Sequence, residues 1–195
     1  MGQYFRPVIL KKDFQMSYTG KEAEVVLKSY DYMMGAKLME TSYIENPYVA
    51  IMEKLLANEF YGYPVVWGGD YAKDIRCFIE GANEEDFVGY DKIIPYDFKS
   101  LYAGELDPQE PKQYRYLLNF TRNEYVDMHK LKEPEGDKWV VHPLPLLCAD
   151  SNGQGGGDYA GKDEKLCGRW AYNEIGVSNE LPEGMLLLET DFEDF

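Results

Sequence analysis

The sequence has few of the residues that build disulfide frameworks, zinc sites or nucleophilic dyads. Its 195 residues include only three cysteines, Cys77, Cys148 and Cys167, and two histidines, His129 and His142. An odd number of cysteines without framework spacing predicts free thiols in a reducing compartment, here the cytoplasm. The spacing of these residues matches neither a Cys–His dyad nor the close ligand pairs of structural zinc. Composition therefore gives little support for an enzyme.

Long apolar runs and clusters of basic residues are also missing. No stretch approaches the roughly 20 apolar residues that a membrane-spanning helix needs, and the first residues lack the pattern of a secretion signal. Lysine and arginine occur together only in short groups such as Lys11-Lys12. The sequence therefore predicts neither membrane insertion nor direct binding of nucleic acid.

Acidic residues and tyrosines are abundant instead. Asp and Glu number 35 against 20 Lys and Arg, which gives a net charge of −15, and there are 17 tyrosines. The negative charge repels nucleic acid and anionic membranes, and it suits either simple solvation or a basic partner. Tyrosine suits half-buried strands, and it also suits interaction surfaces. Both interpretations of each feature remain open.

Length and apolar content predict one folded core. Hydrophobic residues make up 45% of the chain, which is enough for a domain of this size without disulfides or metals. We expect a single compact α+β domain over residues 1–195, with a mainly antiparallel sheet, one clear helix at about 46–61 and a strand-rich C-terminal half. Residues 81–113 lack periodicity and are expected to form an irregular excursion, with a short helix at 96–102.

The helix has a clear beginning and a clear apolar face. Asn46 is suited to the N-cap and Pro47 to the first helical position, while Gly62 and Pro64 should end the helix. Apolar residues then recur at helical spacing, namely Val49, Met52, Leu56 and Phe60.

Runs of β-branched and aromatic residues predict the strands. Two of them should form a hairpin around residues 121–123. Pro143 and Pro145 favour an extended conformation over residues 139–148. The expected strands cover residues 4–10, 24–32, 64–67, 114–120, 124–128, 139–148, 169–177 and 185–189.

The most conspicuous motif is a glycine-rich stretch at residues 150–162. Gly156 and Gly161-Lys162 have the spacing of a phosphate-binding loop, but Asp163 follows where a hydroxyl would bind magnesium. Asp150 and Asn152 alternate as in a calcium loop, although the bidentate glutamate is missing. A nucleotide or divalent-cation site therefore competes with a plain surface loop.

A short internal repeat includes part of this stretch. Gly-Gly-Asp-Tyr-Ala occurs at residues 68–72 and again at 156–160. The two copies could close two strands by the same turn chemistry, with glycine and aspartate in their usual roles. Alternatively, Asp70 and Asp158 converge on one ligand or metal site. The candidate ligand residues are Asp70, Asp150, Asn152 and Asp158.

The C-terminal part of the sequence contains acidic residues but no basic residues to compensate their charge. No Lys or Arg occurs from residue 170 to residue 195. The region is either a solvated chain end or a negative surface for a basic partner. The candidate partner-binding residues are Glu180, Glu183, Glu189, Asp191, Glu193 and Asp194.

Several segments together resemble a group of small uncharacterised proteins carried by bacteriophages, prophages and plasmids. They lie at residues 1–5, 37–40, 142–147, 152–159 and 168–171, and the most specific stretch is 139–171. The resemblance implies an accessory protein of a mobile element in the cytoplasm of a bacterial host. It implies no catalytic residue.

Three hypotheses follow. The first is a non-enzymatic inhibitor whose carboxylates occupy the phosphate-binding surface of a basic, nucleic-acid-binding host protein, such as a CRISPR effector. The second is a metal- or nucleotide-binding protein, or an enzyme, that uses residues 150–162. The third is a structural component of a phage.

Overall fold

The structure is a computed structural model, and it combines one mostly antiparallel sheet with a few short helices. The predicted α+β class is confirmed. The expected excursion at 81–113, the short helix at 96–102, part of the second expected strand, Cys77 and Asp194 lie outside the described residues. Those that the structure describes are 2–12, 23–26, 37–44, 46–72, 114–133, 136 and 138–193.

Three strands from the N-terminal part form one half of the sheet. Strand β1 (Phe5–Leu10) pairs antiparallel with β2 (Ala23–Val26) on one side and with β3 (Tyr63–Gly69) on the other. In the β1–β3 register Val8 lies opposite Val66, and both are fully buried. The strands expected at 4–10 and 64–67 are confirmed.

The other half of the sheet comes from the C-terminal part. Strands β4 (Tyr116–Asn119) and β5 (Glu124–Asp127) form the predicted hairpin, in which Asn123 adopts a positive φ of 56°. Asn119 closes the turn because its side-chain oxygen accepts a hydrogen bond of 2.9 Å from the Arg122 amide.

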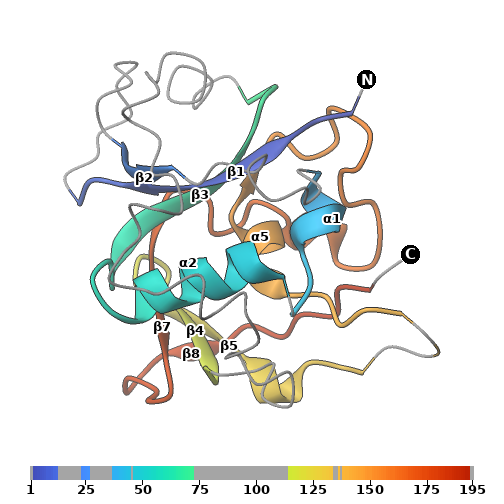
Figure 1. The fold of residues 1–195 in the computed structure, drawn as a ribbon. Helices are drawn as coiled ribbons and strands as arrows, with labels where there is room; N and C mark the ends of the chain where they lie inside the picture. The colour runs from blue at the N-terminus through green and yellow to red at the C-terminus, as the bar shows by residue number, and fades with distance from the viewer. Residues whose placement is uncertain are drawn as a thin grey trace.

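Strand β7 (Asn173–Ser178) joins the two halves, because it pairs antiparallel with both β3 and β4. Two short strands run parallel to their neighbours: β6 (Ala149–Asp150) beside β3, and β8 (Leu186–Leu187) beside β5. The strand order is β2-β1-β3-β7-β4-β5-β8, so β8 lies at one edge of the sheet (Figure 1).

The predicted helix is confirmed as α2 (Pro47–Ala57). Asn46 caps it, since its side-chain oxygen accepts a hydrogen bond of 2.9 Å from the Tyr48 amide. The helix ends at Ala57, before the glycine and proline that were expected to end it. A short helix, α1 (Leu38–Thr41), precedes α2. Further along the described chain lie the 3-10 turns η4 (Met128–Lys130) and η5 (Glu164–Leu166).

The extended conformation predicted for residues 139–148 is wrong over its second half. Residues Pro143–Leu147 form a short helix, α5, with all five residues buried. Both prolines lie in its first turn, where a missing N–H costs nothing because no partner exists for it within the helix. The amide between them, that of Leu144, is bound by the His142 ring at 3.2 Å. Prolines at these two positions are therefore compatible with a helix.

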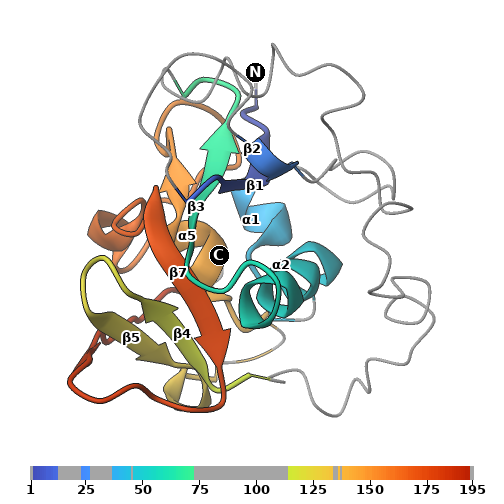
Figure 2. The same ribbon diagram turned by 90° about the vertical axis from the view of Figure 1, so that its left-hand side faces the viewer.

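The main core lies between the sheet and the helices. Figures 1 and 2 show α1, α2 and α5 together on one side of the strands. Burying their apolar side chains is the main stabilising contribution, at about 25 cal/mol per Å². The largest fully buried side chains include Trp67, Trp170, Tyr48, Tyr159 and Phe5.

One buried polar pair connects two of the helices. The His142 Nε2 atom, just before α5, lies 3.0 Å from Glu53 Oε1 on α2, and these side chains are 1% and 8% exposed. Because His142 Nδ1 accepts the Leu144 amide, Nε2 is the donor to Glu53. The imidazole thus caps one helix and binds the buried carboxyl group of another.

We expect His142→Ala to lower the free energy of unfolding by roughly 3 kcal/mol, because it leaves the Glu53 carboxyl group buried without a partner and removes the cap of α5. Urea denaturation monitored by circular dichroism measures the change. The matched control is His129→Ala, since the His129 side chain is exposed and should contribute less than about 0.5 kcal/mol. Equal midpoints for the two variants would contradict this role of His142.

Candidate functional site

The two copies of Gly-Gly-Asp-Tyr-Ala lie on either side of one buried side chain, that of Gln3. Its Oε1 atom accepts the Tyr71 amide of the first copy at 3.3 Å. Its Nε2 atom donates to Asp158 Oδ1 of the second copy at 3.0 Å, and to the carbonyl of Ser151 at 2.7 Å. Gln3 is 0% exposed and also donates its own amide to the Gly156 carbonyl.

This arrangement explains one glycine of the first copy, Gly69, and the glycine directly before the second copy, Gly155. A Cβ atom at Gly69 would lie 2.5 Å from Gln3 Oε1, and one at Gly155, beside the second copy, would lie 2.9 Å from the Gln3 Cβ. Both distances are shorter than real contacts. The glycines therefore let the backbone of two loops approach the same side chain.

The two aspartates of the repeat face donors of the protein itself. Asp70 accepts the Tyr4 amide at 3.2 Å, and Asp158 accepts the Gly155 amide at 2.7 Å in addition to Gln3. Both carboxylates therefore lie beside the N-terminal segment 2–4, but Asp70 binds the Tyr4 amide and Asp158 binds the Gln3 side chain. Their geometry matches the turn chemistry better than a shared ligand site.

The remaining candidates of the glycine-rich stretch are engaged in the same way. Asn152 makes two hydrogen bonds to the backbone of Tyr159, at 2.9 and 3.0 Å. Asp150 accepts the Tyr172 hydroxyl at 2.5 Å. Lys162, at the position of a phosphate-binding lysine, pairs with two carboxylates of the C-terminal part. Within the described ranges, no group of three or more His, Cys, Asp or Glu residues could hold a metal ion.

The acidic residues near the C-terminus fall into two classes. Glu180, Glu183 and Glu189 are exposed, and their carboxylates make no hydrogen bond or ion pair with another described residue. Asp191 and Glu193 are paired with lysines. Only the first class presents uncompensated charge to the surroundings.

Asp191 is the centre of the paired class. Its carboxylate binds both Lys132, at 2.5 Å, and Lys162. These two ammonium groups hold the pKa of Asp191 below its usual range, with Lys132 contributing most. The Asp191 amide donates to Asp163 Oδ2 at 2.9 Å, which fixes the backbone at the same point.

The neighbouring residues extend this attachment. The Phe192 ring packs edge-on against buried Tyr159 at a centroid distance of 5.4 Å. The Glu193 amide donates to the Tyr159 hydroxyl at 3.1 Å. Upstream, the amides of Leu186 and Leu188 bind the carbonyls of Asn123 and Tyr125. Residues 186–193, which we call the C-terminal strap, are thus held at both ends.

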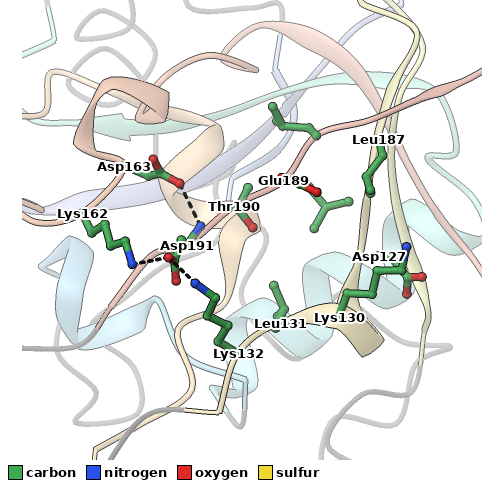
Figure 3. A pocket seen from close by; sticks show the side chains of 12 residues that line it. Asp127, Lys130, Leu131, Lys132, Lys162, Asp163, Leu187, Glu189, Thr190 and Asp191 are labelled. Atoms are coloured by element: carbon green, nitrogen blue, oxygen red, sulfur yellow. Dashed lines mark hydrogen bonds and ion pairs between the residues drawn. The ribbon is translucent and has the colours of Figure 1, made fainter.

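A pocket of about 570 Å³ lies beneath the strap (Figure 3). Its walls come from the end of β5, from residues 130–132 after it, from Lys162 and Asp163, and from residues 187–191 of the strap. Figure 3 shows Asp191 between Lys132 and Lys162, with Leu131 and Leu187 nearer to Lys130. The pocket therefore combines leucine surface with charges of both signs.

Sequence reasoning missed the basic side of this site. It placed Asp191 and Glu193 on a surface free of cations, because the two lysines that bind Asp191 lie 29 and 59 positions before it in the sequence. The available signal was the loop lysine Lys162, followed by an aspartate at the wrong position for a phosphate-binding loop. Its role in the structure is to hold the strap.

We expect Gln3→Ala to lower the free energy of unfolding by roughly 2 kcal/mol, because it leaves the Tyr71 amide, the Ser151 carbonyl and part of Asp158 without partners. The matched control is Gln154→Ala, since Gln154 is exposed in the same loop system. Urea denaturation of the two variants measures the difference. A Gln3 variant as stable as the control would show that the two loops hold their shape without it.

The ion pairs of Asp191 should hold the strap in place. Asp191→Asn should increase hydrogen exchange of the amides at 188–193 several-fold while leaving the core strands protected, because it removes the ion pairs with both lysines. Glu189→Gln is the control, since Glu189 makes no ion pair with a described residue. Mass spectrometry of exchanged peptides provides the measurement.

The same attachment should weaken in acid. A carboxyl group with a lowered pKa in the folded state stabilises that state above its unfolded pKa, and the contribution disappears as the pH falls through the folded value. The protection factor of the strap amides in wild type, which is exchange relative to the intrinsic rate at the same pH, should therefore fall only below about pH 4 and should approach that of Asp191→Asn there. Strap protection unchanged by both substitution and acid would contradict the assignment.

Two further findings bear on function. None of the helices within the described residues is long and apolar enough to cross a membrane. Comparison of the chain with protein-family models, with curated proteins and with solved structures found no match.

Proposed function

We propose that this chain is a non-enzymatic binding protein that occupies the phosphate-binding surface of a basic, nucleic-acid-binding protein. The observation that carries the proposal is the set of uncompensated carboxylates in the segment that follows β7 and includes β8. Glu180, Glu183 and Glu189 lie within ten residues and have no ion-pair partner among the described residues. A basic surface that normally binds phosphates would supply their counter-charges.

Exposed leucines accompany these carboxylates. Leu181, Leu186 and Leu187 are 38%, 67% and 39% exposed, and they belong to the same segment. Apolar side chains at the centre of an interface lose water on binding, whereas surrounding charges direct the encounter. The three glutamates and three leucines, which we call the acidic edge, therefore have the composition of a protein-binding surface.

The net charge of −15 supports the same partner class in two ways. It disfavours direct contact with nucleic acid, and it accelerates association with a basic protein at low salt. The resemblance to proteins of mobile elements suggests host defence complexes as the first partners to test, in the cytoplasm of a bacterial cell. CRISPR effectors present positively charged channels that hold nucleic acid by its backbone.

The alternative functions lack an observation of this kind. A ligand or metal at residues 150–162 would have to displace the existing partners of Asp150, Asn152 and Asp158. A structural role in a phage particle predicts a defined homo-oligomer, and size measurement tests it. The acidic edge thus remains the best-supported site.

The test is displacement of fluorescent target DNA from purified, guide-loaded CRISPR effectors of several types, at low and at high salt. The decisive variant carries Glu180→Gln, Glu183→Gln and Glu189→Gln together. The matched control carries Glu59→Gln, Glu164→Gln and Glu174→Gln. These three residues are also exposed, and their loss changes the net charge equally.

We expect the wild type and the control to displace DNA from at least one effector at low salt, and the acidic-edge variant to do so at least tenfold less well. High salt should weaken the displacement, because the interaction depends on exposed charges. Equal loss in the two triple variants would show that only total charge matters. No displacement from any effector would remove this partner class.

A further inference from the structure

The pocket beneath the C-terminal strap has the size of a small-molecule site. Its volume of about 570 Å³ falls within the range of roughly 300–1,000 Å³ that such sites occupy in proteins. It borders the acidic edge but does not depend on a protein partner. Of the three glutamates of that edge, only Glu189 lines the pocket.

The pocket offers an apolar surface from separate parts of the chain. Val126 comes from β5, Leu131 from the segment after η4, and Leu187 and Leu188 from the strap. The strap carries these two leucines over the pocket because its other end is fixed at Asp191. A branched aliphatic group is the ligand moiety that such a surface binds best.

The charged groups around the pocket are not equivalent. At one end, Asp191 already binds Lys132 and Lys162, so these three charges largely neutralise one another. Asp127 is likewise bound by Arg115, at 3.0 Å. Lys130 and Glu189 differ, since neither side chain makes a hydrogen bond or ion pair with another residue in the described part of the chain, although the Lys130 ammonium group also attracts the Asp127 carboxylate.

A third polar group lines the same pocket. The Thr190 Oγ1 atom is buried, and it is the one buried side-chain nitrogen or oxygen among the described residues without a hydrogen-bond partner. Buried hydroxyl groups rarely lack a partner, and each exception calls for an explanation. A polar group of a ligand in the pocket would supply that partner after rotation of the Thr190 side chain.

We propose that this pocket binds a small zwitterion with an aliphatic body, of the class of apolar α-amino acids and their dipeptides. The carboxylate pairs with Lys130, the ammonium group pairs with Glu189, and the aliphatic part packs against Leu131 and Leu187. A simple anion fits less well, because Glu189 would repel it and two of the three lysines are already engaged. A simple cation would face Lys130.

Isothermal titration calorimetry of the full chain with four probes tests the proposal. L-leucine and Leu-Leu represent the two sources of the zwitterion, and the tighter of them identifies which one fits. N-acetyl-leucinamide keeps the aliphatic body but lacks both charges, so it should bind at least tenfold more weakly. Inorganic phosphate tests for an anion site.

Variants assign the charges. Lys130→Met and Glu189→Gln should each weaken binding of the better zwitterion roughly tenfold, which corresponds to the loss of one ion pair. Lys165→Met and Glu183→Gln are matched controls, because both residues are exposed and neither lines the pocket. All four positions are on the surface, so the variants should fold, which urea denaturation verifies.

Several results would overturn the proposal: no binding of either zwitterion at about 10 mM, equal binding of the neutral analogue, tighter binding of phosphate, or equal losses in the control variants. None of these results bears on the acidic edge, since the DNA-displacement assay contains no small ligand. Failure of that assay would equally leave the calorimetry interpretable.

Discussion

The pairing of β7 with both β3 and β4 is the constraint on which the rest of the structure depends. It joins the N-terminal strands to the C-terminal hairpin in one sheet. Just before β7, Tyr172 adopts a positive φ of 64° while its amide binds the Val65 carbonyl. Such a conformation costs on the order of 1 kcal/mol and persists because surrounding contacts hold it. The C-terminal strap reaches the β5 edge because β7 directs the chain there.

The sheet arrangement also sorts the acidic residues. Carboxylates of the C-terminal strap form ion pairs with lysines from distant parts of the chain, as Asp191 does with Lys132 and Lys162. The carboxylates of Glu180 and Glu183, in the turn between β7 and β8, form no ion pair with a lysine or arginine among the described residues. The net charge therefore overestimates how many carboxylates are available to a basic partner, and it does not show where on the surface they lie. The separation of paired from unpaired carboxylates is what restricts the proposed interface to the acidic edge.

Local patterns in the sequence were sufficient for much of the fold. The cap at Asn46 and the apolar spacing after it predict α2, and the turn at 121–123 predicts the β4–β5 hairpin, because these signals act over a few residues. The extended conformation predicted for 139–148 is wrong over its second half, because the first turn of a helix tolerates proline. The strand expected from 169 begins only at Asn173. Before it, η5 is followed by turns in which the amides of Gly168, Trp170 and Tyr172 bind carbonyls of distant residues.

The candidate site was less predictable for the same physical reason. The role of Gln3 depends on residues 68 and 155 positions away. The repeat of Gly-Gly-Asp-Tyr-Ala signalled that two loops share a chemistry, but the glutamine that both loops contact carries no pattern of its own. Likewise, the pairing of Lys162 with Asp191 spans 29 positions. Contacts of this length follow from the sheet topology, which a single sequence does not contain.

Glu189 connects the two proposed sites and constrains how they can work together. It belongs to the acidic edge, and it is the one unpaired carboxylate of that edge that lines the pocket. A ligand ammonium group bound to Glu189 would neutralise a charge that a basic partner would otherwise meet. Coupling between binding sites is reciprocal, so a bound partner would reduce the affinity for the ligand by the same factor. If both sites operate, the geometry therefore favours competition between a small zwitterion and a basic protein over cooperation between them.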